Sequence, residues 1–196
     1  MSQLHRPLAE LEEKFQRLPP PPTNSGRLIL IVCRHAPGNH EALAGVRLTP
    51  EEGVPGDEWN RRPPCNPDAQ LTVIRHDVAR LLGNGQPLTT SGDNLIVDLD
   101  ISAANLPVGT RLRVGDALVE VSPKPHNGCH KFQGRFGADA FRFVQAPATR
   151  HHNLRGIYWR VLEAGDAQVG CPILVLSRPE INDGHRASAE TPGLIT

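Results

Sequence analysis

The chain has 196 residues, of which 38% are hydrophobic, and its 21 lysines and arginines balance 21 aspartates and glutamates. This length and composition predict one ordinary globular domain with its own core, and they exclude a disordered, collagen-like or coiled-coil chain. The zero net charge argues against a generally basic protein of the kind that binds nucleic acid. An average of zero can nevertheless hide a charged patch.

Three features bear on the compartment. The longest apolar run, 28–33, is much shorter than the roughly 20 residues that a membrane-spanning helix needs. The N-terminal residues lead into Glu10, Glu12 and Glu13 instead of an apolar signal core. The four cysteines are too sparse and irregular for a secreted disulfide scaffold. We therefore expect a cytoplasmic protein with reduced thiols and no membrane partner.

The first 26 residues predict a helical arm. Its apolar side chains recur every three or four positions and share one stripe of a helix: Leu4, Leu8, Leu11, Phe15 and Leu18. Four consecutive prolines at 19–22 end this helix in an extended segment. We expect residues 1–26 to form the arm and its proline-rich linker, and the simplest role for such an arm is packing without chemistry.

From Arg27 onward, short apolar runs alternate with Gly, Pro, Asn and Asp, a pattern typical of strands joined by turns. The runs that predict strands are 28–33, 71–74, 94–99, 111–114, 117–121 and 173–176. Gly115 and Asp116 predict a two-residue hairpin turn. Short helices are expected at 76–82 and 137–144. The sequence thus predicts a mainly β domain at 27–178 with a few peripheral helices, followed by an extended or disordered tail at 179–196.

The charge is unevenly distributed along the chain. Residues 122–160 carry seven lysines and arginines against the single acid Asp139, which leaves +6 there and −6 on the remainder. The same stretch holds four of the nine histidines and six of the eight aromatic residues. This mixture suits a flat anionic ligand. The alternative is that the arginines only neutralise acids elsewhere through surface pairs, each worth about 0–1 kcal/mol.

Cys129 is the candidate reactive residue. It lies in a polar, turn-like segment beside Gly128, with His126, His130 and Lys131 within three positions. Nearby positive charge favours the thiolate, which is both the nucleophile and the metal-binding form. The segment therefore predicts a functional thiol.

Other interpretations of the cysteines are weaker. Zinc held by His126, Cys129 and His130 lacks a second ligand pair at CxxC or HxxxH spacing. A cysteine protease lacks any signal for an oxyanion hole. Cys33, in an apolar run, and Cys171, at a strand entrance, fit structural positions.

A series of short motifs, taken in order and spacing, resembles the MOSC domain, which is named after the C-terminus of molybdenum-cofactor sulfurases. In the C-terminal half the motifs are GCHKF at 128–132, RFG at 135–137, LRGIY at 154–158 and VLEAG at 161–165. Upstream they are GVPGD at 53–57, QLTVI at 70–74, GDNL at 92–95 and LRVGD at 112–116. The resemblance covers approximately 27–178 and implies a β-barrel-like fold.

The resemblance also implies a site. The family's characteristic cysteine corresponds to Cys129, which would carry sulfur as a persulfide or ligate molybdenum in a pterin-bound cofactor. That molybdenum cofactor (molybdopterin) is anionic through its phosphate, which Arg135 and Arg155 would hold. The full set of residues expected at the cofactor is His126, Asn127, His130, Lys131, Arg135, Arg155, Asp57 and Asn94.

The function implied is that of a stand-alone MOSC protein, acting in sulfur transfer or in molybdenum-dependent reduction of N-hydroxylated compounds. The chain has no room for a pyridoxal-phosphate desulfurase, so a separate cysteine desulfurase would load a persulfide. The alternative is a non-catalytic module that binds or delivers molybdopterin or another small anionic metabolite. Some positions depart from the family pattern on loops that would shape the pocket: Trp59 in place of His, Asp93 in place of Glu and Cys171 in place of Asp.

Overall fold

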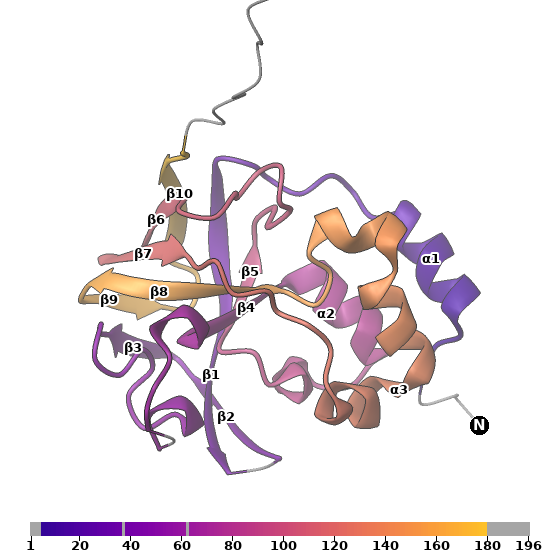
Figure 1. The fold of residues 1–196 in the computed structure, drawn as a ribbon, viewed down its shortest axis with the longest axis horizontal. Coiled ribbons are helices and arrows are strands. Elements are labelled where there is room, and N and C mark those ends of the chain that lie inside the picture. The colour runs from indigo at the N-terminus through magenta and orange to yellow at the C-terminus, as the bar shows by residue number, and fades with distance from the viewer. Residues whose placement is uncertain (1–4, 37, 62, 180–196) are drawn as a thin grey trace, which may run out of the picture.

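The computed structural model describes residues 5–36, 38–61 and 63–179 and contains a β-barrel with a layer of helices on one side (Figure 1). Within these ranges, seven strands close into a ring in the order β1 (Ser25–Ala36), β10 (Pro172–Ser177), β6 (Arg111–Val114), β7 (Ala117–Val121), β8 (Ile157–Glu163), β4 (Leu71–Arg75) and β5 (Leu95–Asp98). The ring closes because β1 pairs with both β5 and β10. Each pairing is antiparallel except that of β4 with β5, which is parallel.

Three further strands lie outside the ring. β2 (Asn39–Leu43) continues the sheet at the far end of β1. β3 (Gly45–Leu48) and β9 (Gly165–Gln168) pair with each other in a small sheet of their own. Short 3-10 turns connect the strands at η1 (Glu58–Arg61), η2 (Pro67–Ala69), η3 (Leu88–Ser91) and η4 (Pro147–His152).

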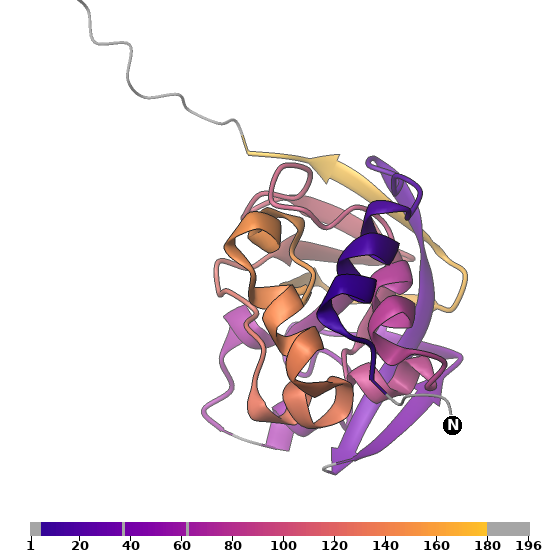
Figure 2. The same ribbon diagram turned by 90° about the vertical axis from the view of Figure 1, so that its right-hand side faces the viewer.

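The helices α1 (Leu8–Gln16), α2 (His76–Gly83) and α3 (His130–Gln145) lie side by side against the barrel (Figure 2). α2 directly follows β4 and forms part of the crossover to β5 that a parallel pair requires. α3 is broken at Gly137, whose φ of +89° is outside the helical region. No helix in the described part of the chain is long and apolar enough to cross a membrane.

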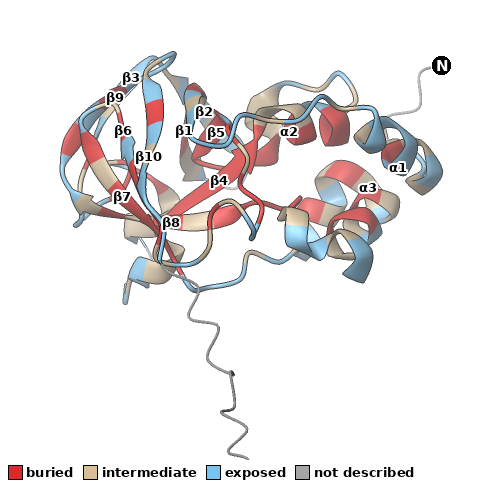
Figure 3. Ribbon diagram, turned by 90° about the horizontal axis from the view of Figure 1, so that it is seen from above, coloured by how far each residue is buried: buried red, intermediate tan, exposed pale blue. Residues whose placement is uncertain are grey.

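Successive side chains on a strand point to opposite faces, and this alternation produces two hydrophobic cores. Val73 and Leu95 point into the barrel, whereas Ile74 and Ile96, the next residues along the same strands, pack under the helices. The buried residues accordingly line the barrel interior and the inner faces of the helices (Figure 3).

The predicted mainly β fold is confirmed, and each of the six predicted strands is present. The Gly115-Asp116 turn joins β6 to β7 with Val114 opposite Ala117, and Gly115 adopts a φ of +57°. Four strands were not predicted: β2, β3, β8 and β9. The predicted helix at 137–144 is the second half of the longer α3. The predicted tail lies outside the described residues from 180 onward, and the domain boundaries stay a prediction.

α1 is anchored by apolar contacts to the helical layer. Leu11 is fully buried, and the Phe15 ring packs edge to face on Phe143 with 5.8 Å between centroids. Arg6 donates from Nε to the carbonyl oxygen of Leu81 at 3.1 Å, which ties the start of the arm to α2. The arm thus completes the core under the helices.

We expect Leu11→Ala to lower the free energy of unfolding by about 2–5 kcal/mol, because it leaves a cavity in this core. Urea denaturation followed by circular dichroism measures the change. Glu12→Ala, at the exposed neighbouring position, is the matched control and should change little. Equal stability of the two variants would show that α1 does not contribute to the core.

Candidate functional site

The candidate site lies on the outer surface of the barrel wall, where β1, β4, β5 and β8 approach the start of α3. Thr72 on β4 pairs in register with Tyr158 on β8, and both alternate with inward residues of the barrel core. Because side chains alternate across a strand, Thr72 and Tyr158 face outward together. Arg34, near the end of β1, also donates from Nη1 toward Thr72 Oγ1 at 3.5 Å.

Asp57 holds Arg34 in place through a bidentate ion pair. Arg34 Nη2 donates to Asp57 Oδ2 at 2.6 Å and Arg34 Nε to Oδ1 at 3.0 Å. The carboxylate also accepts from the Arg34 backbone N–H at 2.7 Å, and from Asn94 Nδ2 and the Trp59 backbone N–H, each at 3.0 Å. Burial alone would raise the pKa of Asp57, but the hydrogen bonds and charge of Arg34 outweigh it and lower this pKa below its ordinary value.

Asp57 and Asn94 therefore position other groups. Asn94 is fully buried, with its Oδ1 accepting from the Thr72 N–H and hydroxyl and its Nδ2 donating to Asp57 and to the Val32 carbonyl oxygen. Every polar atom of the two side chains is engaged within the protein. In the structure the two side chains fix Arg34, and their predicted contacts with a cofactor stay a prediction.

Arg155 reaches the site from a strained turn before β8. Asn153 has a φ of +52° and Gly156 a φ of +101°, and a Cβ at Gly156 would collide with the Val73 carbonyl oxygen. Arg155 Nη1 donates to both oxygens of the buried Asp93, at 2.9 and 3.2 Å. Its guanidinium lies over the Phe132 ring, 5.0 Å from the centroid. Its Nε is buried without a hydrogen-bond partner.

Arg135 is the third arginine of the cluster. Its Nη1 donates to the Ser91 carbonyl oxygen at 2.7 Å. Burial lowers the pKa of Arg135, with opposing influences from Asp93 and Cys129, and the group stays charged. Arg34, Arg135 and Arg155 thus face two buried carboxylates, Asp57 and Asp93. Glu58 also interacts with Arg34, but Lys131 pairs with Glu58, so an excess of positive charge remains.

Cys129 is the exposed member of the four cysteines. It immediately precedes α3, and its backbone carbonyl accepts from the Gln133 N–H at 3.0 Å, while its thiol makes no capping bond. It interacts electrostatically with Arg135 and Tyr158. Cys33 is buried as predicted, and Cys65 is half-buried with its Sγ 3.3 Å from the Trp59 carbonyl oxygen. The thiol at 129 is thus the most exposed of the four.

His126 corrects one electrostatic expectation. Its ring packs on Tyr158, with 4.4 Å between centroids, and its Nδ1 is buried without a partner. Burial, followed by the charges of Arg155 and Arg34, lowers the pKa of His126 well below its ordinary value. The imidazole is neutral at pH 7, so it does not supply the positive charge that the sequence predicts beside Cys129.

The other predicted residues lie close along the chain to the thiol. Asn127 and His130 are exposed, and Lys131 in the first turn of α3 has its Nζ 3.9 Å from Glu58 Oε1.

Burial raises the pKa of Tyr158, so its phenol is protonated at neutral pH. The sequence did not identify Arg34, Thr72 or Tyr158 as site residues, because the grouping depends on strand register.

Two observations limit the expectation that the cations and aromatic residues of 122–160 act together on a flat anionic ligand. Phe132, Phe136, Phe143 and Trp159 are buried in the two cores and present no ring to a ligand. Two cations are neutralised away from the thiol, since Arg142 pairs with Asp139 and Arg160 with Glu120. For these two arginines, the alternative interpretation is therefore confirmed: they neutralise nearby acids through ordinary ion pairs.

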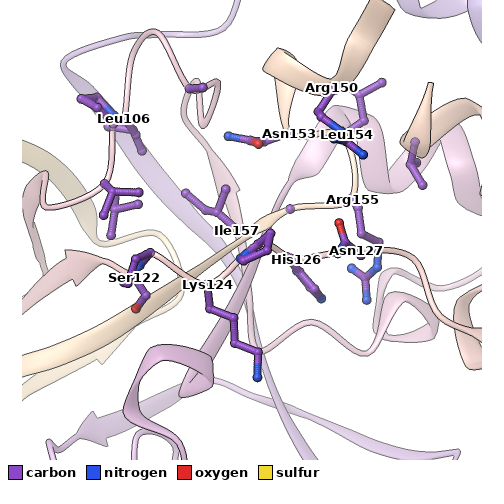
Figure 4. A pocket seen from close by; sticks show the side chains of 18 of the residues that line it. Leu106, Ser122, Lys124, His126, Asn127, Arg150, Asn153, Leu154, Arg155 and Ile157 are labelled. Atoms are coloured by element: carbon purple, nitrogen blue, oxygen red, sulfur yellow. The ribbon is translucent and has the colours of Figure 1, made fainter. Parts of the chain in front are cut away.

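Two cavities border Lys124, on the segment that leads to Cys129. One, of about 370 Å³, is lined by Arg34, Trp59, Cys65, Thr72 and Tyr158 among others. The second, of about 340 Å³, is lined by Ser122, His126, Asn127 and Arg155 among others (Figure 4). Cys129 lines neither. Within the described ranges, no group of three or more His, Cys, Asp or Glu side chains forms a metal site.

Comparisons with known proteins agree with the barrel and with the motifs. The family profile described as MOSC domain matches residues 65–174. Among solved structures, YiiM from Escherichia coli is 22% identical, with a TM-score of 0.53 over 78% of this chain and 71% of that chain. The YuaD protein from Bacillus subtilis is 14% identical, with a TM-score of 0.56 over 76% and 94%. At these identities the likeness shows the fold alone. No curated protein matches the sequence.

We expect Asp57→Asn to lower the free energy of unfolding at pH 7 by about 3 kcal/mol, because Arg34 loses the partner of a largely buried ion pair. The folded-state pKa of Asp57 is depressed, so this stabilisation is present above the ordinary carboxyl value of 3.8 and is lost as the pH falls through the folded-state pKa. Urea titrations at several pH values test this: the difference from the native protein should shrink in acid. Asp98→Asn, at an exposed position, is the control, and a difference independent of pH would contradict the assignment.

Proposed function

Because the chain belongs to the MOSC domain family, we propose that it carries sulfur or holds molybdenum on Cys129, beside a site for a small anionic cofactor. The observation that supports this most directly is the exposed thiol at the start of α3, next to an arginine cluster that two buried carboxylates do not fully neutralise. The family provides the chemistry, and the arrangement provides a reactive group with an anion-binding neighbour.

The residues present fit a molybdenum-pterin cofactor. Its phosphate needs cationic hydrogen-bond donors, and Arg155 Nε is a buried donor without a partner. Arg135 supplies a second guanidinium, and Cys129 supplies the soft sulfur ligand that molybdenum accepts from a protein. When bound, the cofactor would supply a redox-active metal centre.

The remaining side chains orient and tune these groups. Asp57 fixes the plane of Arg34, and Asp93 fixes that of Arg155, so the guanidinium groups are preorganised. Tyr158 keeps its proton at neutral pH and is able to donate a hydrogen bond to a bound anion, while neutral His126 offers a free Nδ1. Preorganised donors bind an anion with little further ordering cost.

The same thiol suits sulfur transfer. The Cys129 thiolate attacks the outer sulfur of a persulfide on a separate cysteine desulfurase, and the sulfur–sulfur bond of the donor breaks. The donor cysteine leaves as a thiolate, and Cys129 keeps the sulfur as a persulfide. Its exposure lets both the donor and a later acceptor reach it.

A binding and delivery module is the second candidate, and the buried arginine pairs favour it. Here the cofactor is held by Arg135 and Arg155 and is passed on without turnover. The thiol then contributes little to retention, which separates the two functions experimentally.

We expect the native protein, incubated with a cysteine desulfurase and cysteine, to gain one sulfur atom on the peptide that contains Cys129. Cys129→Ser should abolish this gain, because a hydroxyl does not form a persulfide, whereas Cys65→Ser should leave it unchanged. Peptide mass spectrometry gives the readout, with elemental analysis for molybdenum on the same samples. If Cys129→Ser retains both sulfur and molybdenum like the native protein, the role of the thiol is refuted.

For cofactor retention, we expect Arg135→Gln to weaken molybdopterin binding about tenfold or more, because a hydrogen bond to a charged group is lost. Raising the salt concentration should reduce the difference, since screening weakens the remaining attraction. Pterin fluorescence after gel filtration measures retention. Arg142→Gln, an exposed arginine on the same helix, is the matched control. Retention equal to the control at low salt would exclude Arg135 from the site.

A further inference from the structure

The cavity of about 340 Å³ beside Arg155 collects unsatisfied polar atoms. Six buried side-chain nitrogen or oxygen atoms lack a hydrogen-bond partner in the described part of the chain, and three of them belong to residues that line this cavity: Ser122 Oγ, His126 Nδ1 and Arg155 Nε. Buried polar atoms in folded proteins nearly always have partners. Three of the six therefore belong to residues around one cavity, whose wall thus holds polar groups that the protein itself does not pair.

The charge around the cavity has one sign. Lys124 and Arg150 line it, and neither forms an ion pair within the described ranges. No aspartate or glutamate is among the lining residues described. Figure 4 shows Lys124 and Arg150 on opposite sides of the space, with His126 and Ile157 between them. The polar part of the lining therefore favours a ligand group that is negatively charged and accepts hydrogen bonds.

The rest of the wall is apolar. Leu106, Val121, Leu154 and Ile157 line the cavity and are buried, and Val108 lines it with 55% of its surface exposed. A volume near 340 Å³ corresponds to roughly eleven water molecules at about 30 Å³ each. The space thus fits a compact organic molecule, and apolar walls with a few converging polar groups are typical of small-molecule sites.

We propose that this cavity binds a small organic anion, a carboxylate with a compact apolar body. The acid group accepts a hydrogen bond from Ser122, and Lys124 and Arg150 attract it from opposite sides of the cavity. The body packs on Val121, Leu154 and Ile157. Cys129 is not among the lining residues. This binding site shares Arg155 and His126 with the cofactor site proposed above, but it does not include the thiol and so does not depend on sulfur or molybdenum chemistry.

The test uses 2-naphthoate as the probe and 2-naphthamide as its uncharged counterpart, with the full chain and isothermal titration calorimetry. We expect saturable binding of 2-naphthoate, about tenfold or more tighter than that of 2-naphthamide, because the amide has no charge to pair with the cations. Rising salt should weaken the binding of the anion only. No saturable binding, or equal affinity for the two probes, overturns the proposal and leaves a cavity filled by water.

Variants locate the probe. Ser122→Ala and Arg150→Gln should each weaken 2-naphthoate binding about five- to tenfold, while Arg142→Gln should leave it unchanged. Circular dichroism confirms that each variant is folded. Cys129→Ala should bind 2-naphthoate like the native protein, even if sulfur loading is lost. Weakening by Cys129→Ala with none by Ser122→Ala or Arg150→Gln would place the probe at the thiol and overturn the assignment to this cavity.

Discussion

The structure depends on the pairing of β1 with three other strands. Its first residues pair with β10, its middle with β5 and its end with β2, so this strand closes the barrel and also carries Arg34 to the site. The register with β5 shifts between Leu28 and Leu30, which is the signature of a bulge. Leu28 and Ile31 therefore both reach the barrel core, and Ile29 and Leu30 both pack under the helices. Arg34 faces outward because of this shift.

Much of the fold could be predicted from local patterns, for identifiable reasons. The run 28–33 and the hairpin at Gly115-Asp116 carry their signal in a few adjacent residues, and both formed. β8 was missed because its inward residues, Ile157 and Trp159, alternate with Tyr158 and Arg160, and the charges in this stretch suggested a binding surface instead. β3 and β9 are short and pair only with each other, so their sequences carry little signal of their own.

The candidate site shows the same division between local and distant information. Cys129 and its neighbours were found because they are adjacent in the chain. Arg34 joins Asp57 and Asn94 only through the alignment of β1, β4 and β5, and no spacing in the sequence encodes that alignment. The clustered phenylalanines misled for a physical reason: helical periodicity turns Phe132 and Phe136 in the first half of α3, and Phe143 in the second half, into the core under the helices.

The shared wall of β4 and β5 also affects how the molecule unfolds. Val73 and Leu95 belong to the barrel core, while their neighbours Ile74 and Ile96 belong to the helical core. If either core lost its packing, one face of β4 and β5 would be exposed and the other core would lose its support. Barrel and helices therefore form one cooperative unit. Arg155, Arg135 and Arg34 come from different parts of that unit. A ligand that bridges these arginines therefore stabilises the barrel and the helices together. Unfolding remains a single transition, and its melting temperature rises with ligand concentration.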